Sequence, residues 1–265
     1  MSANSTLYIG ASGLRSFASA MSLVSDNVAN ANTTAFKSSQ ARFGDMVSSY
    51  VSTLSANTDR EGCGSSLLGV STNFEQGPML GTDSWSDLAI NGDGFFNVQK
   101  PGGTENFYTR DGAFHLDKDG YLVNSQEYAL LDTSGARIQA EPTPDTPTYK
   151  AYSVTADGEV YGTPTGGGDA VLIATVRVCS FPNQDGLVRQ GNNLYQPGPT
   201  AGDVVDGQAN VNGNGSISDM TIEGSNVDLA TEMVNMIIYQ ADYNANSKSV
   251  TAGQGMLDTV INMVR

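Results

Sequence analysis

The sequence predicts an α+β protein: long N- and C-terminal α-helices pair as a coiled coil, and between them lies a mainly antiparallel, hairpin-rich β body. Three observations carry this prediction. Apolar residues recur every seven positions at both ends, Asp-Gly and Asn-Gly dipeptides recur through the middle, and the 265-residue chain holds 30 glycines and 9 prolines. Sevenfold apolar spacing is typical of paired helices, whereas these dipeptides are typical of tight hairpin turns.

The first helix is expected over residues 5–30. Two interleaved sets of residues recur every seven positions, namely Leu7, Leu14, Met21 and Val28, and Gly10, Phe17, Val24 and Ala31. This is the spacing of a helix-pairing seam. The candidate interface residues here are Leu7, Leu14, Phe17, Met21, Val24 and Val28. The alternative is a helix that packs only on its own domain.

Residues 45–84 are rich in Ser, Thr, Gly and Asn, and we expect an extended arm with at most one strand. Residues 85–225 alternate short apolar runs with turn dipeptides such as Asp111-Gly112 and Asp157-Gly158. The expected β body therefore spans this range. Its candidate strands are residues 94–99, 105–110, 121–124, 128–132, 171–180 and 193–196.

The last segment, residues 226–265, contains no proline and predicts a second long helix with Asn226 as its N-cap. Its candidate interface residues follow a sevenfold repeat with three flanking positions: Leu229, Met233, Met236, Ile237, Tyr243, Val250, Leu257, Ile261 and Val264. A helix of forty residues is about 60 Å long, and an apolar stripe of that length needs a partner. The first helix is the nearest one. A pair would still leave apolar surface for further subunits.

Charge supports the same division of the chain. The net charge is −15, of which residues 1–44 contribute +2 and residues 226–265 contribute −2, so the middle carries the full −15. We therefore expect residues 1–44 and 226–265 to form one domain whose ends meet, beside an acidic body that faces water. A polyanion excludes nucleic acid and anionic lipid as partners.

The sequence predicts neither membrane insertion nor a cleaved signal peptide. Every apolar run is shorter than the ~18–20 residues that cross a bilayer. Near the N-terminus, Arg15 interrupts the one candidate apolar stretch, and no cationic segment precedes it.

No enzyme, cofactor or metal chemistry is expected. His115 is the single histidine, and no nucleophile stands in a recognisable motif beside it. The acidic run at residues 117–120 lacks the spacing of a calcium loop and fits a hairpin turn. Two cysteines, Cys63 and Cys179, leave open a single disulfide.

Five short motifs then resemble one family, the axial proteins of the bacterial flagellum, which includes rod and hook proteins. They are ASGL at residues 11–14, SDNVANANTTAFK at 25–37, DLAINGDGFF at 87–96, YTRDGAF at 108–114 and SNVDL at 225–229. Two positions depart from the family pattern. Ala35 stands where a glycine commonly precedes the phenylalanine, and Ala241 stands where the C-terminal helix usually carries arginine.

The resemblance implies a structural subunit of the hook–basal body that polymerises into a hollow helical tube, transmits torque and passes exported subunits. It implies terminal helices on the inner wall, an outer β domain, and neighbouring rod, hook and junction proteins as partners. Export through the type III apparatus, with a cap chaperone, agrees with the absent signal peptide. The protein would lie in the periplasmic or extracellular part of the flagellum.

Within the family, residues 257–265 are more similar to hook proteins, whereas the modest length and the arm are similar to the distal rod protein. We favour the hook protein slightly. The alternative from another class is a β-rich adhesin or carbohydrate-binding module whose helices oligomerise it.

Overall fold

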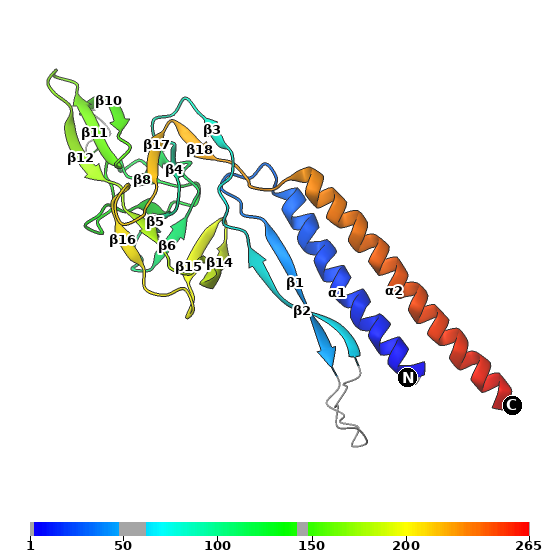
Figure 1. Ribbon diagram of the computed structural model, residues 1–265. Coiled ribbons are helices and arrows are strands. Elements are labelled where there is room, and N and C mark those ends of the chain that lie inside the picture. The colour runs from blue at the N-terminus through cyan, green and yellow to red at the C-terminus, as the bar shows by residue number, and fades with distance from the viewer. Residues whose placement is uncertain (1–2, 48–61, 142–147, 265) are drawn as a thin grey trace. The chain divides into compact units, whose positions relative to one another are not determined.

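A computed structural model describes residues 3–47, 62–141 and 148–264 (Figure 1). The chain divides into two compact units. We call residues 1–31, 38–73 and 227–265 the helical unit, and residues 32–37 and 74–226 the body. The fold is α+β with an antiparallel β body and one long helix at each end, as the sequence predicts.

The helical unit contains helix α1 (Ala3–Ala29), helix α2 (Leu229–Val264) and a hairpin of strands β1 (Ser39–Val47) and β2 (Gly62–Thr72). The predicted N-cap of α2 is wrong by two residues. Asp228 caps the helix, because its carboxylate accepts hydrogen bonds from the Ala230 amide at 3.0 Å and the Thr231 hydroxyl at 2.6 Å. These hydrogen bonds, that from Thr231 foremost, lower the pKa of Asp228.

Residues 45–84 contain more strand than the single one expected from their composition. They include the end of β1, all of β2 and strand β3 (Met79–Gly81), while residues 48–61 lie outside the described part of the chain. β1 and β2 pair antiparallel from Ser39 opposite Thr72 to Val47 opposite Gly62. β1 therefore begins inside the segment assigned to the first helical domain.

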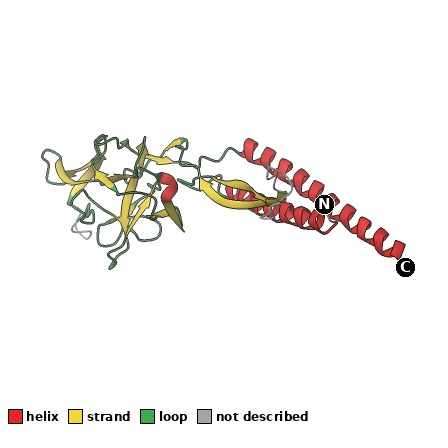
Figure 2. Cartoon of the chain, turned by 60° about the horizontal axis from the view of Figure 1, so that its bottom comes forward, coloured by secondary structure: helices red, strands yellow, loops and turns green. Residues whose placement is uncertain are grey.

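The body is built almost entirely from short antiparallel strands (Figure 2). Besides β3, they are β4 (Leu88–Asn91), β5 (Phe95–Gln99), β6 (Asn106–Thr109), β7 (His115–Leu116), β8 (Leu122–Val123), β9 (Ala129–Leu130), β10 (Tyr149–Val154), β11 (Glu159–Pro164), β12 (Val171–Thr175), β13 (Val178–Ser180), β14 (Leu187–Gly191), β15 (Leu194–Pro197), β16 (Val205–Gly207), β17 (Ser216–Asp219) and β18 (Thr221–Glu223). The largest sheet runs β14-β15-β6-β5-β9-β8-β7, with β13 also paired to β5 and β16.

Strand β5 lies at the centre of the body because both of its faces are buried. Consecutive side chains of a strand point to opposite faces. Phe96 and Val98 join one apolar cluster with Leu88, Leu122 and Leu130. Phe95 joins a second cluster, in which its ring centroid lies 5.8 Å from Phe181 and 5.9 Å from Tyr195. Two consecutive phenylalanines of β5 thus pack in two different hydrophobic clusters.

Each of the six candidate strands overlaps a strand of the structure, with one difference. The run at 171–180 is two strands, since β12 pairs with β11 while β13 pairs with β5 and β16. Periodicity within one apolar run does not show that its two halves belong to different sheets.

A buried carboxylate joins distant segments of the body. The Glu223 carboxylate, with no solvent exposure, accepts hydrogen bonds from Lys37 Nζ at 2.7 Å and the Gly77 amide at 2.8 Å. Arg110 Nη1 lies 3.6 Å from its second oxygen. Burial lowers the pKa of Lys37, and the charge of Glu223 opposes this effect. We call these three charged side chains the Glu223 clasp.

Backbone and amide groups reinforce the Glu223 clasp. The Ala35 amide donates to the Glu223 carbonyl at 2.8 Å, and the Asn226 amide donates to Phe36. The Asn226 side chain donates to the Glu75 carbonyl at 3.0 Å. Residues 34–37, 74–77 and 223–226 are therefore held at one place in the body, next to the four points at which the chain passes from one unit to the other.

Ala35 occupies a left-handed backbone conformation, with φ of +53°. A Cβ atom makes this region unfavourable for residues other than glycine. This explains why glycine is common at this position in the family that the motif resembles. The chain retains the conformation with alanine because Ala35 is fully buried and its amide is hydrogen-bonded to Glu223.

We predict that Glu223→Gln lowers the free energy of unfolding of the body by about 3 kcal/mol, because Lys37 and Arg110 lose their buried counter-charge. Urea unfolding of the full chain measures this change. Glu105→Gln is the matched control, since Glu105 is exposed, and a surface change of this kind is expected to stay within about 0.5 kcal/mol. Equal effects of the two variants would contradict the role given to Glu223.

We also predict that Ala35→Gly raises the free energy of unfolding by about 1 kcal/mol, because the strain of a Cβ atom at positive φ is removed. The same urea measurement applies. Ala156→Gly, at an exposed turn position that is not among the positive-φ residues, serves as control and should lower stability by a few tenths to about 1 kcal/mol. Destabilisation by Ala35→Gly would show that the conformation carries no strain.

Candidate assembly surface

The two terminal helices run antiparallel within the helical unit, with Leu7 near the start of α1 beside Gly253, and α2 continues beyond the start of α1 (Figure 1). Glycines let them approach closely. A Cβ atom on Gly10 would lie 2.6 Å from Val250 Cγ2, and one on Gly253 would lie 2.9 Å from Leu7 Cδ2. Gly253 of α2 thus makes room for Leu7 of α1.

The structure brings part of the predicted interface together between the helices. On α1, Val24 is buried and the remaining predicted residues are half-buried, namely Leu7, Leu14, Phe17, Met21 and Val28. On α2, the half-buried ones are Met236, Val250 and Leu257. Only some of the predicted interface residues of α2 therefore face α1.

The other predicted residues of α2 are exposed, namely Leu229, Met233, Ile237, Tyr243 and Ile261. Val264 ends the helix, and its side chain lies outside the described residues. Residues such as Ile237, which is 66% exposed, do not face α1. Exposed apolar side chains of this size on a helix indicate a surface made to be covered.

Sequence reasoning missed further exposed apolar residues on α2. They are Val234, Ile238, Met256, Val260 and Met263. At 100° per residue, most of them project on the side of α2 away from α1, together with Met233 and Ile237. We call this side the outer face of α2. A helical projection that allowed two apolar stripes on one helix, instead of one sevenfold seam, would have found these residues.

The hairpin of β1 and β2 also belongs to this unit and packs against α1 and α2. The ring of Phe43 lies 5.6 Å from Phe17 and 6.2 Å from Tyr239, so the three aromatic rings form one cluster. Ser16 on α1 donates a hydrogen bond to the Ser65 carbonyl at 3.1 Å. Leu68 and Val70 of β2 remain exposed and add to the apolar surface of the unit.

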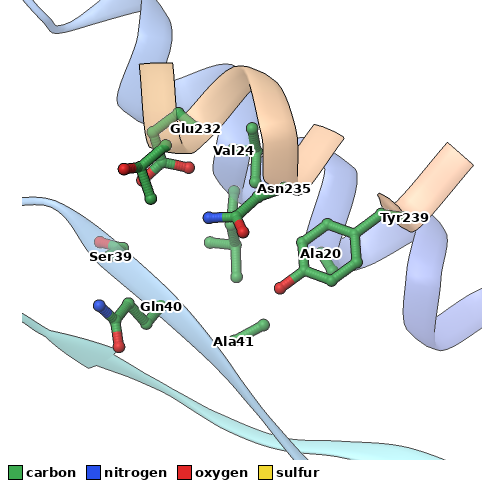
Figure 3. A pocket seen from close by; sticks show the side chains of 10 residues that line it. Ala20, Val24, Ser39, Gln40, Ala41, Glu232, Asn235 and Tyr239 are labelled. Carbon is green, nitrogen blue, oxygen red and sulfur yellow. The ribbon is translucent and has the colours of Figure 1, made fainter. Parts of the chain in front are cut away.

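A cavity of about 300 Å³ opens between α1, α2 and β1 in the helical unit (Figure 3). Ala20 and Val24 of α1 and Ala41 of β1 supply apolar wall, and Glu232 and Tyr239 of α2 supply polar groups. Beside it, Asn27 Nδ2 donates to Glu232 Oε1 at 2.9 Å and to the Ser39 carbonyl at 2.8 Å. The Ser39 amide donates back to Asn27 Oδ1 at 2.8 Å, which fixes β1 to the end of α1.

Groups that could carry chemistry have structural partners. Neither cysteine forms a disulfide. Burial, with a hydrogen bond to Asp206, raises the pKa of the Cys179 thiol well above its ordinary value, so this thiol stays protonated. Among the described residues, no cluster of three His, Cys, Asp or Glu side chains is placed to hold a metal ion. His115 is exposed on β7.

Within the described residues, neither terminal helix combines the length and apolar character that a membrane span requires. Together, the outer face of α2, the hairpin and the cavity make the helical unit the candidate assembly surface.

Three family signatures match the chain along its length. Residues 7–37 match the flagella basal body rod protein family, residues 89–162 match the flagellar hook protein FlgE/F/G D1 domain, and residues 220–263 match the flagellar basal body rod FlgEFG protein C-terminal family. They include both terminal helices and the first part of the body.

Curated relatives extend this similarity to the whole chain. The flagellar basal-body rod protein FlgG of Bacillus subtilis is 33% identical, over 98% of this chain and 99% of that protein. The FlgG of Borreliella burgdorferi is 30% identical, over 98% of each. The hook protein FlgE of the same organism is 33% identical, but over 71% of this chain and 43% of the hook protein.

The slight preference for a hook protein is not supported, because rod proteins match from end to end whereas the hook match covers less than half of that protein. Nor do these matches support the alternative of an adhesin or carbohydrate-binding module. The predictions of a structural protein, of no enzymatic activity and of a place in the flagellum are confirmed. The chain therefore belongs to the family of flagellar rod and hook proteins, whose members assemble with neighbouring components of the flagellum.

Proposed function

We propose that this chain is a subunit of the flagellar rod and that its copies polymerise into a hollow helical tube. The observation that carries the proposal is the end-to-end match with FlgG rod proteins, which extends over 99% of the Bacillus subtilis protein. Torque passes along such a tube, and exported subunits pass through it.

The polymer would form through the terminal helices. In this proposal residues 1–44 and 226–265 line the inner wall as an antiparallel coiled coil, residues 45–84 form a connecting arm, and residues 85–225 form the outer layer. The exposed outer face of α2 supports this arrangement. A monomer leaves Met233, Val234, Ile237 and Met263 of this face more than half exposed, and contact with another copy removes this apolar area from water.

Each of the predicted interface residues has a place in this proposal. The buried and half-buried ones hold the two helices of one copy together, namely Leu7, Leu14, Phe17, Met21, Val24, Val28, Met236, Val250 and Leu257. Exposed residues of α2 meet other copies, namely Leu229, Met233, Ile237, Tyr243 and Ile261. Val264 continues the same repeat.

Neighbouring rod, hook and junction proteins would cap the two ends of the polymer. Export by the type III apparatus, assisted by a cap chaperone and without a cleaved signal peptide, completes the proposal. The charge partition supports it, because the nearly neutral ends suit burial inside a tube, while residues 45–225, which carry the net −15, suit an arm and outer layer in water.

We predict that an antibody against the body labels the rod in purified hook–basal bodies seen by electron microscopy. The physical reason is the end-to-end match with rod proteins rather than with the longer hook protein. Particles from a strain that lacks the gene provide the control. Label along the hook would contradict the rod assignment and leave the family unaffected.

We predict that Ile237→Asp reduces the polymer yield of the full chain at least tenfold without unfolding the monomer. Ile237 is 66% exposed, so the charge is solvated in the monomer and becomes buried on assembly. Sedimentation of polymer measures the yield, and circular dichroism measures the fold. Val171→Asp, which places the same charge on an exposed apolar residue of the body, is the control.

Removal of residues 1–35 and 226–265 should abolish assembly altogether. Polymer formation by that truncated chain would overturn the proposal that the terminal helices drive assembly.

A further inference from the structure

The cavity of the helical unit has the lining of a site for a long cationic side chain. Its volume is about 300 Å³. Ala20, Val24 and Ala41 supply apolar wall for an aliphatic stem, and the carboxylate of Glu232 and the hydroxyl of Tyr239 supply acceptors at the polar side (Figure 3). This combination suits lysine, whose stem is apolar and whose ammonium group has three donors.

Glu232 is a buried carboxylate without a cation among the described residues. The residue is 8% exposed, and its Oε1 accepts one hydrogen bond from Asn27 Nδ2 at 2.9 Å. In the part of the chain that the structure describes, no lysine or arginine forms an ion pair with it. A carboxylate that is largely removed from water is costly unless a positive charge compensates it.

Lys248 of α2 carries the opposite charge. It follows Ile237 by eleven residues, about three helical turns, so both side chains leave α2 on the same side. It is exposed on the outer face, between the apolar residues 233–238 and 256–263. The described residues offer it no ion pair. When another copy covers this face, Lys248 loses water and needs an anionic partner.

The two residues cannot meet within one copy. Both lie on α2, sixteen residues apart, which at 1.5 Å per residue is about 24 Å along the helix axis. A lysine side chain is far shorter than this distance. Any pairing of Lys248 with Glu232 is therefore a contact between copies. Each copy provides Lys248 to one such contact and Glu232 to another.

We propose that Lys248 of one copy enters the cavity of a second copy and pairs there with Glu232. The stem packs on Ala20, Val24 and Ala41, and the ammonium group donates to the Glu232 carboxylate and to Tyr239. This inference rests on the proposed polymer. It adds register, because the pair fixes the position of one α2 along another, which apolar contact alone does not specify.

Arg15 is another exposed cation of the helical unit. It lies on α1 between the small residues Ala11 and Ala18 of the same side, away from the large exposed side chains that mark the outer face of α2. Lys248 is therefore the better occupant, and Arg15 is the competing outcome of the test.

Crosslinking in the assembled polymer tests the pairing. The full chain carries Cys63→Ser, to remove the exposed thiol, together with Glu232→Cys and Lys248→Cys. Cys179 is kept, because it is buried. A short bismaleimide is added to polymer and to monomer. We expect a ladder of dimers, trimers and higher species on denaturing gels from the polymer, and none from the monomer, because every copy carries both halves of the contact.

The outcomes separate the two proposals. Polymer that forms but gives no ladder overturns the Lys248–Glu232 pairing and leaves the proposed function standing. A ladder from Glu232→Cys with Arg15→Cys, but not with Lys248→Cys, also overturns it. Failure of the parent chain to polymerise counts against the proposed function itself. If Glu232→Cys disturbs the fold, Gln40→Cys replaces it, since Gln40 is exposed and lines the same cavity.

Charge variants give an independent readout. Lys248→Glu should reduce polymer yield at least tenfold, and Lys248→Arg should retain it. Glu232→Gln keeps an oxygen for Asn27 and removes the charge, so it should weaken assembly without lowering monomer stability. Lys150→Glu, at an exposed position of the body, is the control. Equal yields for Lys248→Glu and Lys150→Glu would overturn the inference.

Discussion

One buried carboxylate organises the body of this protein at the places where the chain enters and leaves it. Glu223 accepts from Lys37, from the amide of Gly77 and, through its backbone carbonyl, from the amide of Ala35. These groups come from three stretches far apart in the sequence, each adjoining a boundary between the units. Lys37 and Arg110 are buried beside it. Because a buried cation is costly without a counter-charge, the positions of all three stretches depend on the Glu223 carboxylate.

The two units have different kinds of surface, and the difference follows from how each buries its apolar residues. In the body, β5 places Phe95 and Phe96 in separate clusters, so short strands enclose two cores. In the helical unit, two helices and one hairpin enclose a narrow seam and leave Ile237 and Val260 in water. A helix pair has too little surface to bury two apolar stripes on one helix. The second stripe is the surface that we propose to meet other copies.

The sequence predicted the fold class, both helices and six candidate strand regions because these depend on local patterns. Sevenfold spacing and Asp-Gly turns are readable without tertiary context. The split of residues 171–180 between two sheets was not readable, since it depends on the partners β11 and β5. The cap at Asp228 was missed because Asn226, an equally good capping residue, is used instead to bond Phe36 and Glu75.

The contact between the two helices was predictable in part, and the interface between copies stays a prediction. The sevenfold repeat included Val250, which lies against Gly10 of α1. One stripe does not describe a helix with apolar residues on two sides, so the exposed Ile238 and Met256 were not singled out. The Glu232 carboxylate is buried because Asn27 and β1 pack beside it. Its lack of an ion pair with the described residues therefore cannot be predicted from the spacing of residues within α2.

The contrast between the two cysteines has a practical consequence. Cys179 is buried, and its raised pKa keeps it as an unreactive thiol that bonds Asp206, whereas Cys63 stands exposed on β2. Alkylation proceeds through the thiolate, so a fluorophore or spin label added to the unmodified chain attaches at one position. The unmodified chain thus offers a single built-in probe site in its helical unit, at which optical or magnetic resonance methods can follow the surroundings of β2.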